Sequence, residues 1–320
     1  MGENYKDYDR ELYLKASLLM EDRQEEQATK ILEQLLTKLS ENNPEEAFLK
    51  SEILVTKGFY TANLKTIQEG MEYIQKAAKI LQSVDGGSKS QQMALIQNAL
   101  GEFHYRMGKI QEAAEHLEQS SKILDYLIEE ETDEDNKRML YMKQAYCYEY
   151  LGNFHSDLRN FDEAKQFLES SLNIWKQLSG GGRPVDAEHI KVINSLGVLY
   201  ATYGQFDKGI EYLQQSKALL EPLEQRYPEL YAWTLLCLAR YYHMQFDYKG
   251  SQKFVLQAET ISRKYNAPLP YMSQILEHKS NILNCLGQYQ ESLNCTVEAL
   301  KAMEERGSTK DSLYCRLLYA

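Results

Sequence analysis

The chain has 320 residues, enough for about two ordinary domains or for one elongated array of repeats. Hydrophobic residues make up 43% of it and charged residues 26%, which excludes a disordered chain, and the 6 prolines leave helix favoured over strand. A net charge of −11 disfavours binding to nucleic acid or to an anionic membrane surface.

The first residues of the chain and its cysteines both indicate a cytoplasmic protein. Residues 1–12 lack the apolar core of a signal peptide, and no run of 18 apolar residues follows, so we expect no membrane insertion. The five cysteines form no CxxC motif and no Cys/His ligand cluster. We expect them to be buried as small hydrophobic residues in a reducing compartment.

Apolar residues recur with i, i+3 and i+4 spacing along the whole chain, which predicts pairs of amphipathic helices. We expect seven helical hairpins in a single domain spanning residues 1–320. A further helix at 311–320 either caps the last hairpin or begins an eighth repeat of a longer protein. The predicted hairpins cover residues 8–40, 45–84, 90–130, 137–178, 186–221, 229–264 and 269–306.

Three stretches between or within these hairpins are read from their composition. The first hairpin is poorly marked and polar, as expected of a terminal cap. The acidic run at 129–135 is expected to be a solvated loop or a frayed helix end, rather than a binding site for a basic partner. The glycine run at 180–182 lacks a phosphate-loop motif, so we expect a flexible connection.

The fifth hairpin, residues 189–220, is the best-preserved copy. Only three residues separate its two helices, and Gly204 can adopt the left-handed conformation that ends a helix, so the second helix must fold back on the first. Small residues at Gly197 and Gly209 would let the two backbones approach, while Tyr200 and Phe206 fill the space around them.

This hairpin resembles the tetratricopeptide repeat, through Leu196-Gly197, Tyr200, Gly204 and Phe206, although Gly209 stands where the family usually has Ala. The step from Gly197 to its equivalent Ala239 is 42 residues, longer than the basic repeat of about 34, and is similar to the kinesin-light-chain subclass. The resemblance implies an all-α fold: a right-handed α-solenoid, or superhelix, with a concave groove.

The sequence offers no pattern for catalysis. Its six histidines are scattered, and it has no HExxH or other zinc motif and no nucleotide signature. We expect His104 and His155 to pack within their hairpins. We therefore expect neither enzyme activity, nor a metal site, nor a cofactor.

The concave face of the predicted solenoid is where we expect a partner protein to bind. The first helices of successive hairpins should line this groove. Relative to Gly197 and its equivalents, residues six and three before and one and four after should face it. The partner-binding residues predicted in this way are Asn98, Glu102, Tyr105, Tyr146, Glu149, Asn153, Lys191, Asn194, Val198, Trp233, Arg240, His243 and Asn281.

This face is more polar than a core and richer in aromatic residues than a plain solvated surface, although the alternative remains that these are ordinary hydrophilic positions. An Asn amide offers a donor and an acceptor together, so it can pair with the backbone of any extended peptide. Kinesin-light-chain-like repeats are similar in using groove asparagines in this way. The roles we assign are anchors for Trp233 and Tyr146, backbone clamps for Asn98, Asn153 and Asn194, and selectors of acidic residues for Arg240 and Lys191.

These features favour a non-enzymatic adaptor or scaffold that holds a linear peptide segment of another protein in its groove. One alternative is a peptide-responsive regulator that resembles bacterial pheromone receptors of the tetratricopeptide type. A less favoured alternative is an RNA-binding repeat protein, against which the net charge counts. The identity of the partner and the oligomeric state stay open.

Overall fold

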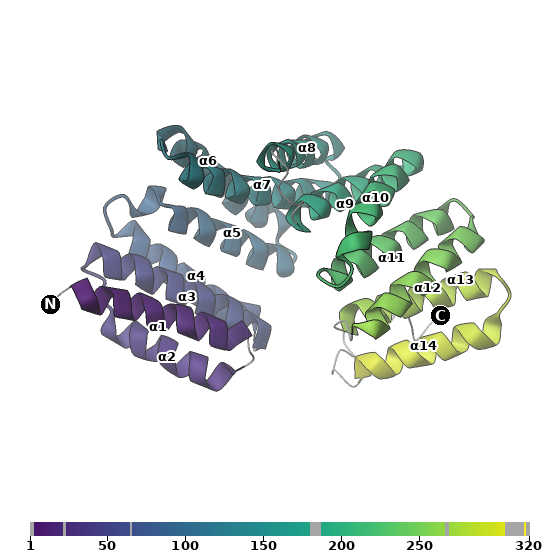
Figure 1. Cartoon of the computed structure of the whole chain (residues 1–320), viewed down its shortest axis with the longest axis horizontal. Coiled ribbons are helices and arrows are strands. Elements are labelled where there is room, and N and C mark those ends of the chain that lie inside the picture. The colour runs from purple at the N-terminus through teal and green to yellow at the C-terminus, as the bar shows by residue number, and fades with distance from the viewer. Residues whose placement is uncertain are drawn as a thin grey trace. The chain divides into compact units, whose positions relative to one another are not determined.

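The computed structural model describes residues 3–21, 24–64, 66–179, 187–265, 269–304 and 317. Every regular element in these ranges is helical, which confirms the predicted all-α fold (Figure 1). The α-helices are α1 (Glu3–Glu21), α2 (Glu25–Lys38), α3 (Pro44–Leu64), α4 (Ile67–Gln82), α5 (Gln91–Arg106), α6 (Ile110–Glu130), α7 (Glu134–Asp157), α8 (Phe161–Leu178), α9 (Ala187–Thr202), α10 (Phe206–Leu220), α11 (Pro228–Met244), α12 (Tyr248–Lys264), α13 (Leu269–Cys285) and α14 (Tyr289–Glu304). Two short 3₁₀ turns, Gly87–Lys89 and Glu221–Leu223, lie in the connections.

The chain divides into two compact units, residues 1–160 and residues 161–320. In unit 1 the helices pair as α1 with α2, α3 with α4 and α5 with α6; in unit 2 they pair as α9 with α10, α11 with α12 and α13 with α14. Helix α7 ends unit 1 and α8 begins unit 2, so the predicted fourth hairpin spans the junction. The hairpins are confirmed within each unit, and a single superhelical domain over residues 1–320 stays a prediction.

The turns that follow α5, α7, α9, α11 and α13 share one geometry, in which a residue has a positive φ. At Gly204 (φ 82°) the backbone is left-handed, and the amide of Gln205 donates to the carbonyl of Tyr200 at 2.9 Å, the bond of a Schellman helix end. Arg159 (φ 66°) and Phe246 (φ 63°) adopt the same conformation without being glycine. Since this conformation costs an L-residue about 1 kcal/mol or more, the hairpin imposes the turn against local preference at these two positions.

The close helix approach predicted for the fifth hairpin is confirmed. A Cβ atom added at Gly197 would lie 2.8 Å from Leu213 Cγ and 3.0 Å from the carbonyl oxygen of Gly209. A Cβ atom added at Gly209 would lie 2.7 Å from both the Gly197 carbonyl oxygen and Ala201 Cβ. Backbone therefore contacts backbone where α9 crosses α10, and Tyr200 is buried beside the contact.

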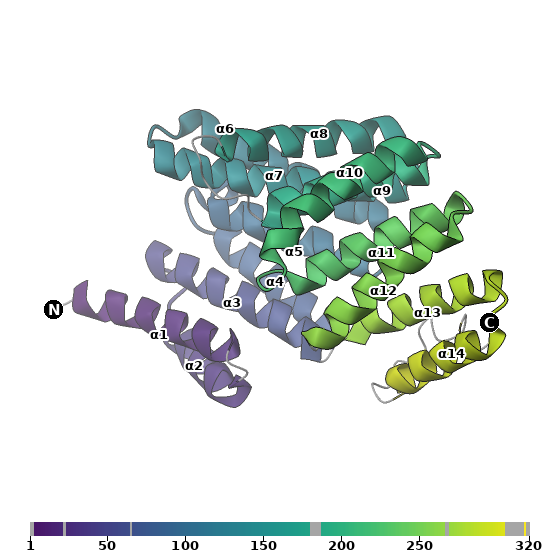
Figure 2. The same ribbon diagram turned by 45° about the vertical axis from the view of Figure 1, so that its right-hand side comes forward.

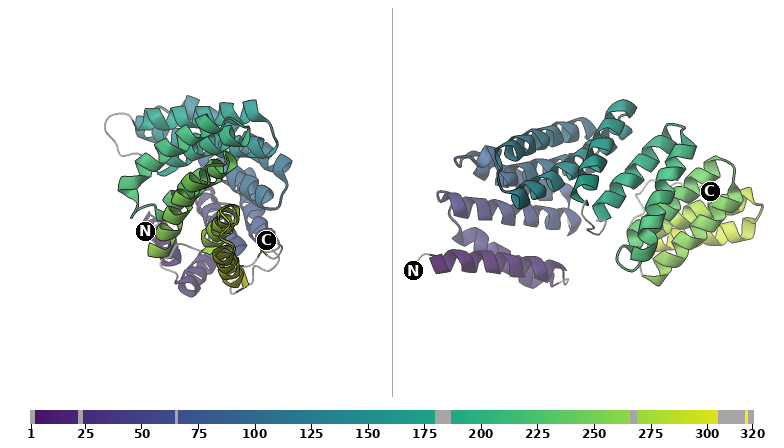
Figure 3. Two further views of the ribbon diagram at one scale, coloured as in Figure 1. Left: turned by 90° about the vertical axis from the view of Figure 1, so that its right-hand side faces the viewer. Right: turned by 45° about the horizontal axis from the view of Figure 1, so that its top comes forward.

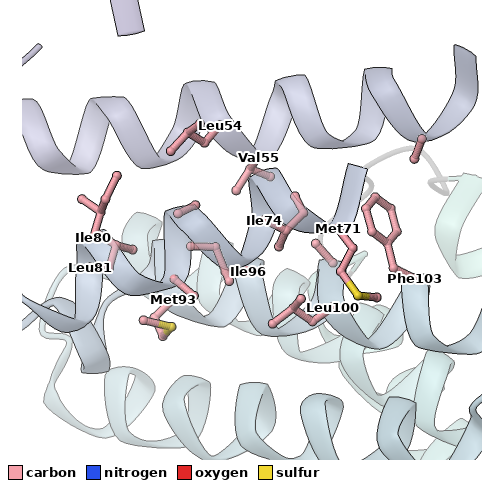
Figure 4. Close-up of a cluster of buried hydrophobic side chains, with 14 of the residues drawn as sticks. Leu54, Val55, Met71, Ile74, Ile80, Leu81, Met93, Ile96, Leu100 and Phe103 are labelled. Atoms are coloured by element: carbon pink, nitrogen blue, oxygen red, sulfur yellow. The ribbon is translucent and has the colours of Figure 1, made fainter. Parts of the chain in front are cut away.

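Each unit has its own hydrophobic core between stacked hairpins. In unit 1 the side chains of α3, α4 and α5 interlock, with Leu54, Ile74, Ile96 and Phe103 among the most buried (Figure 4). In unit 2 a corresponding cluster joins α11, α12 and α13 around Leu235. These cores fix the orientation of the first helices, whose other sides are left for polar contacts.

Successive first helices contact one another directly within each unit, as the further views show (Figures 2 and 3). In unit 1, Glu52 of α3 accepts a hydrogen bond from Gln92 of α5 at 3.1 Å. In unit 2, α11 contacts both α9 and α13. The first helices of a unit thus form one continuous layer, as a solenoid requires.

The acidic run 129–135 lies at two helix ends, as expected, because α6 continues to Glu130 and α7 begins at Glu134 with a short loop between them. The length of these two helices accounts for the wider spacing there. Asp133 caps α7 by accepting from the amide of Asn136 at 2.8 Å. The first hairpin is not polar throughout, since Leu14 and Leu18 of α1 are exposed. The glycine run 180–182 and the predicted helix 311–320 lie outside the described residues, apart from Leu317, which is buried against α13 and α14.

Candidate functional site

A pocket of about 680 Å³ lies on unit 2, where two first helices, α11 and α13, meet. Three of the predicted partner-binding residues, Arg240, His243 and Asn281, line it. Helical spacing explains the convergence, because side chains three or four residues apart share a helix face. The other lining residues are Met244, Glu277, His278, Asn284 and Cys285.

Arg240 is held in place by two neutral neighbours. Its Nη2 donates to Gln274 Oε1 of α13 at 3.1 Å, and its guanidinium carbon lies 5.5 Å from the centre of the Trp233 ring. The indole face attracts a cation through its quadrupole and fixes the guanidinium plane. Trp233 is half-buried and packs into the hydrophobic core of unit 2. This packing fixes the ring against which the Arg240 guanidinium lies.

Two imidazoles form one wall of the pocket. The rings of His243 and His278 lie 5.3 Å apart, and the ring of Tyr248 meets that of His243 edge-on. Burial lowers the pKa of His243 and lowers the pKa of His278 to about 4, so both are neutral near pH 7. Among the described residues, the Nδ1 of His243 is buried and has no hydrogen-bond partner.

Cys285 corrects the expectation that the cysteines are buried. Its thiol is exposed at the end of α13, with Sγ 3.9 Å from His243 Nε2. Of the described cysteines, Cys147, Cys237 and Cys295 are buried as expected, and burial raises the pKa of Cys147 and of Cys237 to about 12. Cys285 and His278 belong to the pocket although sequence reasoning did not select them.

Asn194 differs from its predicted role. It is buried, with 4% of its surface exposed, and its amide nitrogen donates to Thr234 Oγ1 of α11 at 2.8 Å. On α9, position −3 therefore faces the neighbouring first helix, so the side chain of Asn194 is not open to a peptide. Lys191 is exposed and forms an ion pair with Glu188 at 2.7 Å, and its role as a selector of acidic residues stays a prediction.

Val198, the remaining predicted residue of unit 2, also serves the helix layer. Its half-buried side chain packs against the cluster of Cys237 and Tyr241, and its carbonyl accepts from the Tyr241 hydroxyl at 3.4 Å. Contacts between α9 and α11 account for this residue. The pocket residues come instead from the next two hairpins. They include positions +1 and +4 of both hairpins and position −3 of the seventh, which is Glu277.

The predicted residues of unit 1 lie on α5 and α7 and form a separate polar face. Tyr105 donates to the carboxylate of Asp157 and stacks on Phe154, with ring centres 4.4 Å apart. Glu102 lies 3.8 Å from Arg106, and burial raises its pKa. Asn98 is half-buried, and its Oδ1 has no partner among the described residues. The side chains of Tyr146, Glu149 and Asn153 on α7 are half-buried.

His104 of α5 packs against α6, as predicted. Its ring stacks on that of His116, with centres 5.1 Å apart, while His116 Nδ1 lies 2.7 Å from Gln97 Oε1. Burial lowers the pKa of both imidazoles. Within the described ranges no group of three or more His, Cys, Asp or Glu side chains is arranged to hold a metal ion, and no helix there has the length and apolar character to cross a membrane.

Comparison with known proteins agrees with the hairpin geometry. The sequence model of the tetratricopeptide repeat matches residues 144–191. No curated protein sequence matches the chain significantly.

Solved structures of similar fold include a Rap protein complexed with competence and sporulation factor, with 14% identity, a TM-score of 0.65, and coverage of 93% of this chain and 77% of that one. A Rap conjugation gene regulator in complex with a Phr peptide has 14% identity, a TM-score of 0.59, and coverage of 85% and 66%. Kinesin light chain tetratricopeptide-like repeats from Podosopora anserina have 18% identity, a TM-score of 0.52, and coverage of 67% and 94%. At these identities the likeness concerns the fold alone.

The matched repeat and the hairpins of both units lead to the same conclusion. The left-handed turns after α5, α7, α9, α11 and α13, the close approach of α9 to α10 and the layer of first helices are what the family pattern implies. Residues 144–191 match the tetratricopeptide repeat, and the described helices of both units have the fold of tetratricopeptide-like hairpins.

Proposed function

We propose that the chain is a non-enzymatic protein that binds a linear peptide segment of a partner, with the α11–α13 pocket as the main contact site. The observation that carries this proposal is the convergence of Arg240, His243 and Asn281 on one pocket. Its volume falls within the range of about 300–1,000 Å³ that is usual for ligand sites. Such a volume suits one or two side chains of a peptide, while the rest of the peptide lies along the layer of first helices.

The lining chemistry supports a peptide ligand. Asn281 and Asn284 lie three residues apart on α13, so their amides fall on the same side of the helix. Each amide can donate to a peptide carbonyl and accept from a peptide amide without regard to side-chain sequence. The neutral imidazole of His243 adds a further hydrogen-bonding group beside them.

The experiment is a selection of phage-displayed peptides on the intact chain, followed by calorimetric titration of the recovered peptide. Asn281→Trp fills the pocket and should weaken binding at least about tenfold, the equivalent of about 1.4 kcal/mol. Asn294→Trp is the matched control, because Asn294 is an exposed asparagine on α14 that does not line the pocket. Equal affinities of the two variants for the peptide would show that the pocket is not where the peptide binds.

A second candidate, a peptide-responsive regulator, is favoured by one comparison. The Rap conjugation gene regulator, solved with a Phr peptide, has a similar fold. In a regulator of this kind a bound peptide changes the shape of the repeat array, whereas a plain adaptor keeps its shape. Small-angle scattering with and without the selected peptide separates the two, since compaction favours the regulator and an unchanged radius of gyration favours the adaptor.

We assign the protein to the cytoplasm and expect a protein partner, with no nucleic acid. The net charge of −11 supports this, because phosphate backbones require a basic surface. A mobility shift with RNA that weakens as salt is raised would contradict it.

A further inference from the structure

One side of α14 carries an exposed apolar stripe. Tyr289, Leu293 and Val297 follow one another at intervals of four residues, so they form a ridge along the helix. Their exposed fractions are 71%, 56% and 55%, which together amount to roughly 350 Å² of mostly apolar surface. A patch of this size on a soluble protein is often a contact site for another molecule.

The earlier hairpins show what covers the corresponding surface elsewhere. Leu293 is the fifth residue of α14, and the fifth residues of α4 and α10, Met71 and Ile210, are both buried. Ile210 packs against Tyr241 of α11, the first helix of the next hairpin. Leu317 packs against α13 and α14 but leaves Leu293 exposed. Within the described part of the chain, this place on α14 thus has no helix over it.

We infer that α14 is an interface between two copies of this chain, in which the stripes of the two copies pack antiparallel about a two-fold axis. Ridges of residues four apart lie side by side when two helices cross at about −50°, the commonest crossing angle. With the axis between Leu293 and Val297, Leu293 of one copy lies opposite Val297 of the second copy. Lys301, four residues further along the ridge, then lies opposite the Tyr289 ring. The first contact is apolar and the second is a cation–π contact, so the stripe is complementary to itself.

The charges around the stripe allow a second copy to approach. Two chains of net charge −11 repel each other over much of their surfaces, so an interface between them needs a face that is locally not acidic. None of the four stripe positions carries an acidic side chain, and Lys301 adds a positive one. The neighbouring Glu298 is paired with Arg263 of its own copy at 2.7 Å, which reduces its repulsion of a second copy.

The area of the stripe fits a weak dimer. Two stripes contribute roughly 700 Å², and the exposed side chains beside them raise the total to about 1,200 Å², the low end of specific interfaces. These flanking side chains include Gln290, Asn294 and Lys301. Interfaces of this size are often transient, so we expect a dissociation constant on the order of 10 µM.

Sedimentation velocity on the whole chain, from about 1 to about 200 µM, measures the association. The parent should pass from monomer to dimer over this range, and Leu293→Glu should raise the dissociation constant at least about tenfold, because it places a carboxylate against Val297 of the second copy. Leu256→Glu is the matched control, because Leu256 is an exposed leucine of α12 at the position that corresponds to Val297. It should leave the dissociation constant unchanged. A parent that stays monomeric throughout, or equal effects of the two variants, would overturn the inference.

Cross-linking with a short bis-maleimide tests the antiparallel register. All proteins carry Cys285→Ser and Cys315→Ser, because Cys285 is exposed and Cys315 lies outside the described residues. In this register the two copies of residue 289 lie about 18 Å apart along the ridge, whereas residue 289 lies beside residue 301 of the second copy. A mixture of Tyr289→Cys and Lys301→Cys should therefore form cross-linked dimers at least about fivefold faster than either variant alone.

Other occupants of the stripe give different results. If α14 of one copy instead binds α1 of the next, Leu293→Cys should cross-link to Leu18→Cys, which replaces an exposed leucine of α1, and the mixture of the 289 and 301 variants should show no advantage. That pattern would overturn the two-fold arrangement. Equal rates for the mixture and for the single variants would overturn it as well.

Discussion

Replacing Gly209 with alanine sets two effects of known size against each other. Alanine is favoured over glycine inside a helix by about 1 kcal/mol, and the tetratricopeptide pattern itself usually has Ala there. Against this, the new Cβ would lie 2.7 Å from the carbonyl oxygen of Gly197 and 2.8 Å from the backbone nitrogen of Ala201. Backbone atoms cannot rotate away as a side chain can, so α9 and α10 must separate.

Overpacking of this kind costs about 1–3 kcal/mol, which outweighs the gain in helix propensity. We therefore expect Gly209→Ala to lower the free energy of unfolding of unit 2 by about 1 kcal/mol. The pair Gln215→Gly and Gln215→Ala supplies the control on the same helix, because Gln215 of α10 is exposed. At that position the alanine variant should be the more stable by about 1 kcal/mol.

Urea unfolding followed by tryptophan fluorescence measures this change. Both tryptophans, Trp175 and Trp233, lie in unit 2 with Gly209, so the signal reports the unit that carries the substitution. If Gly209→Ala is as stable as the parent protein or more stable, the close approach of α9 and α10 is not what limits this position, and the packing argument is refuted.

Three further changes test other parts of the structure. Phe246→Gly should stabilise unit 2 by roughly 0.5–1 kcal/mol in the same urea assay, because it relieves a left-handed residue whose side chain is 78% exposed; an unchanged midpoint would contradict this. Asp133→Ala should cost unit 1 about 1 kcal/mol by circular dichroism through loss of the α7 cap, while Asp133→Asn should cost little; equal losses would show that the cap hydrogen bond does not matter. The pKa of His278 falls to about 4 on folding, so the unfolded chain binds the proton more tightly, and unit 2 should lose about 2–3 kcal/mol as the pH falls from about 6.5 to about 4. His278→Gln should flatten that part of the pH profile, and an unaltered slope would rule out this residue as its cause.

The repeat pattern in the sequence was sufficient to predict the helices and their pairing. Leu196, Gly197, Gly204 and Phe206 specify a hairpin because apolar spacing, a short turn and small contact residues all favour the same local geometry. Turns without glycine were harder to predict. Arg159 and Phe246 adopt the left-handed conformation because packing of the flanking helices outweighs their own preference.

The site was predicted only in part, because helical spacing does not determine how far around the helix the solvent-facing side extends. Positions +1 and +4 reached the pocket, as Arg240, His243 and Asn281 show. On α9, position −3 lies where this helix meets α11, so Asn194 is buried against Thr234, whereas Glu277 at the same position of α13 lines the pocket. Whether such a residue faces a neighbour or solvent depends on how the hairpins stack, which the spacing within one hairpin does not determine.

Cys285 and His278 are pocket residues that the sequence pattern did not predict. The composition of the chain suggested small buried cysteines, but Cys285 is the last residue of α13, where the helix end is open to solvent. His278 faces His243 because α11 and α13 lie side by side, a contact between residues 35 positions apart in the sequence. Neither placement follows from local pattern.

The central claim is that the α11–α13 pocket is where a partner peptide binds, and a crystal structure with a selected peptide tests it most directly. The account predicts a peptide side chain in the pocket beside Arg240 and His243, and peptide backbone on the amides of Asn281 and Asn284. A peptide bound elsewhere, for example on the exposed apolar side chains of Leu293 and Val297 on α14, with the pocket empty, would contradict it.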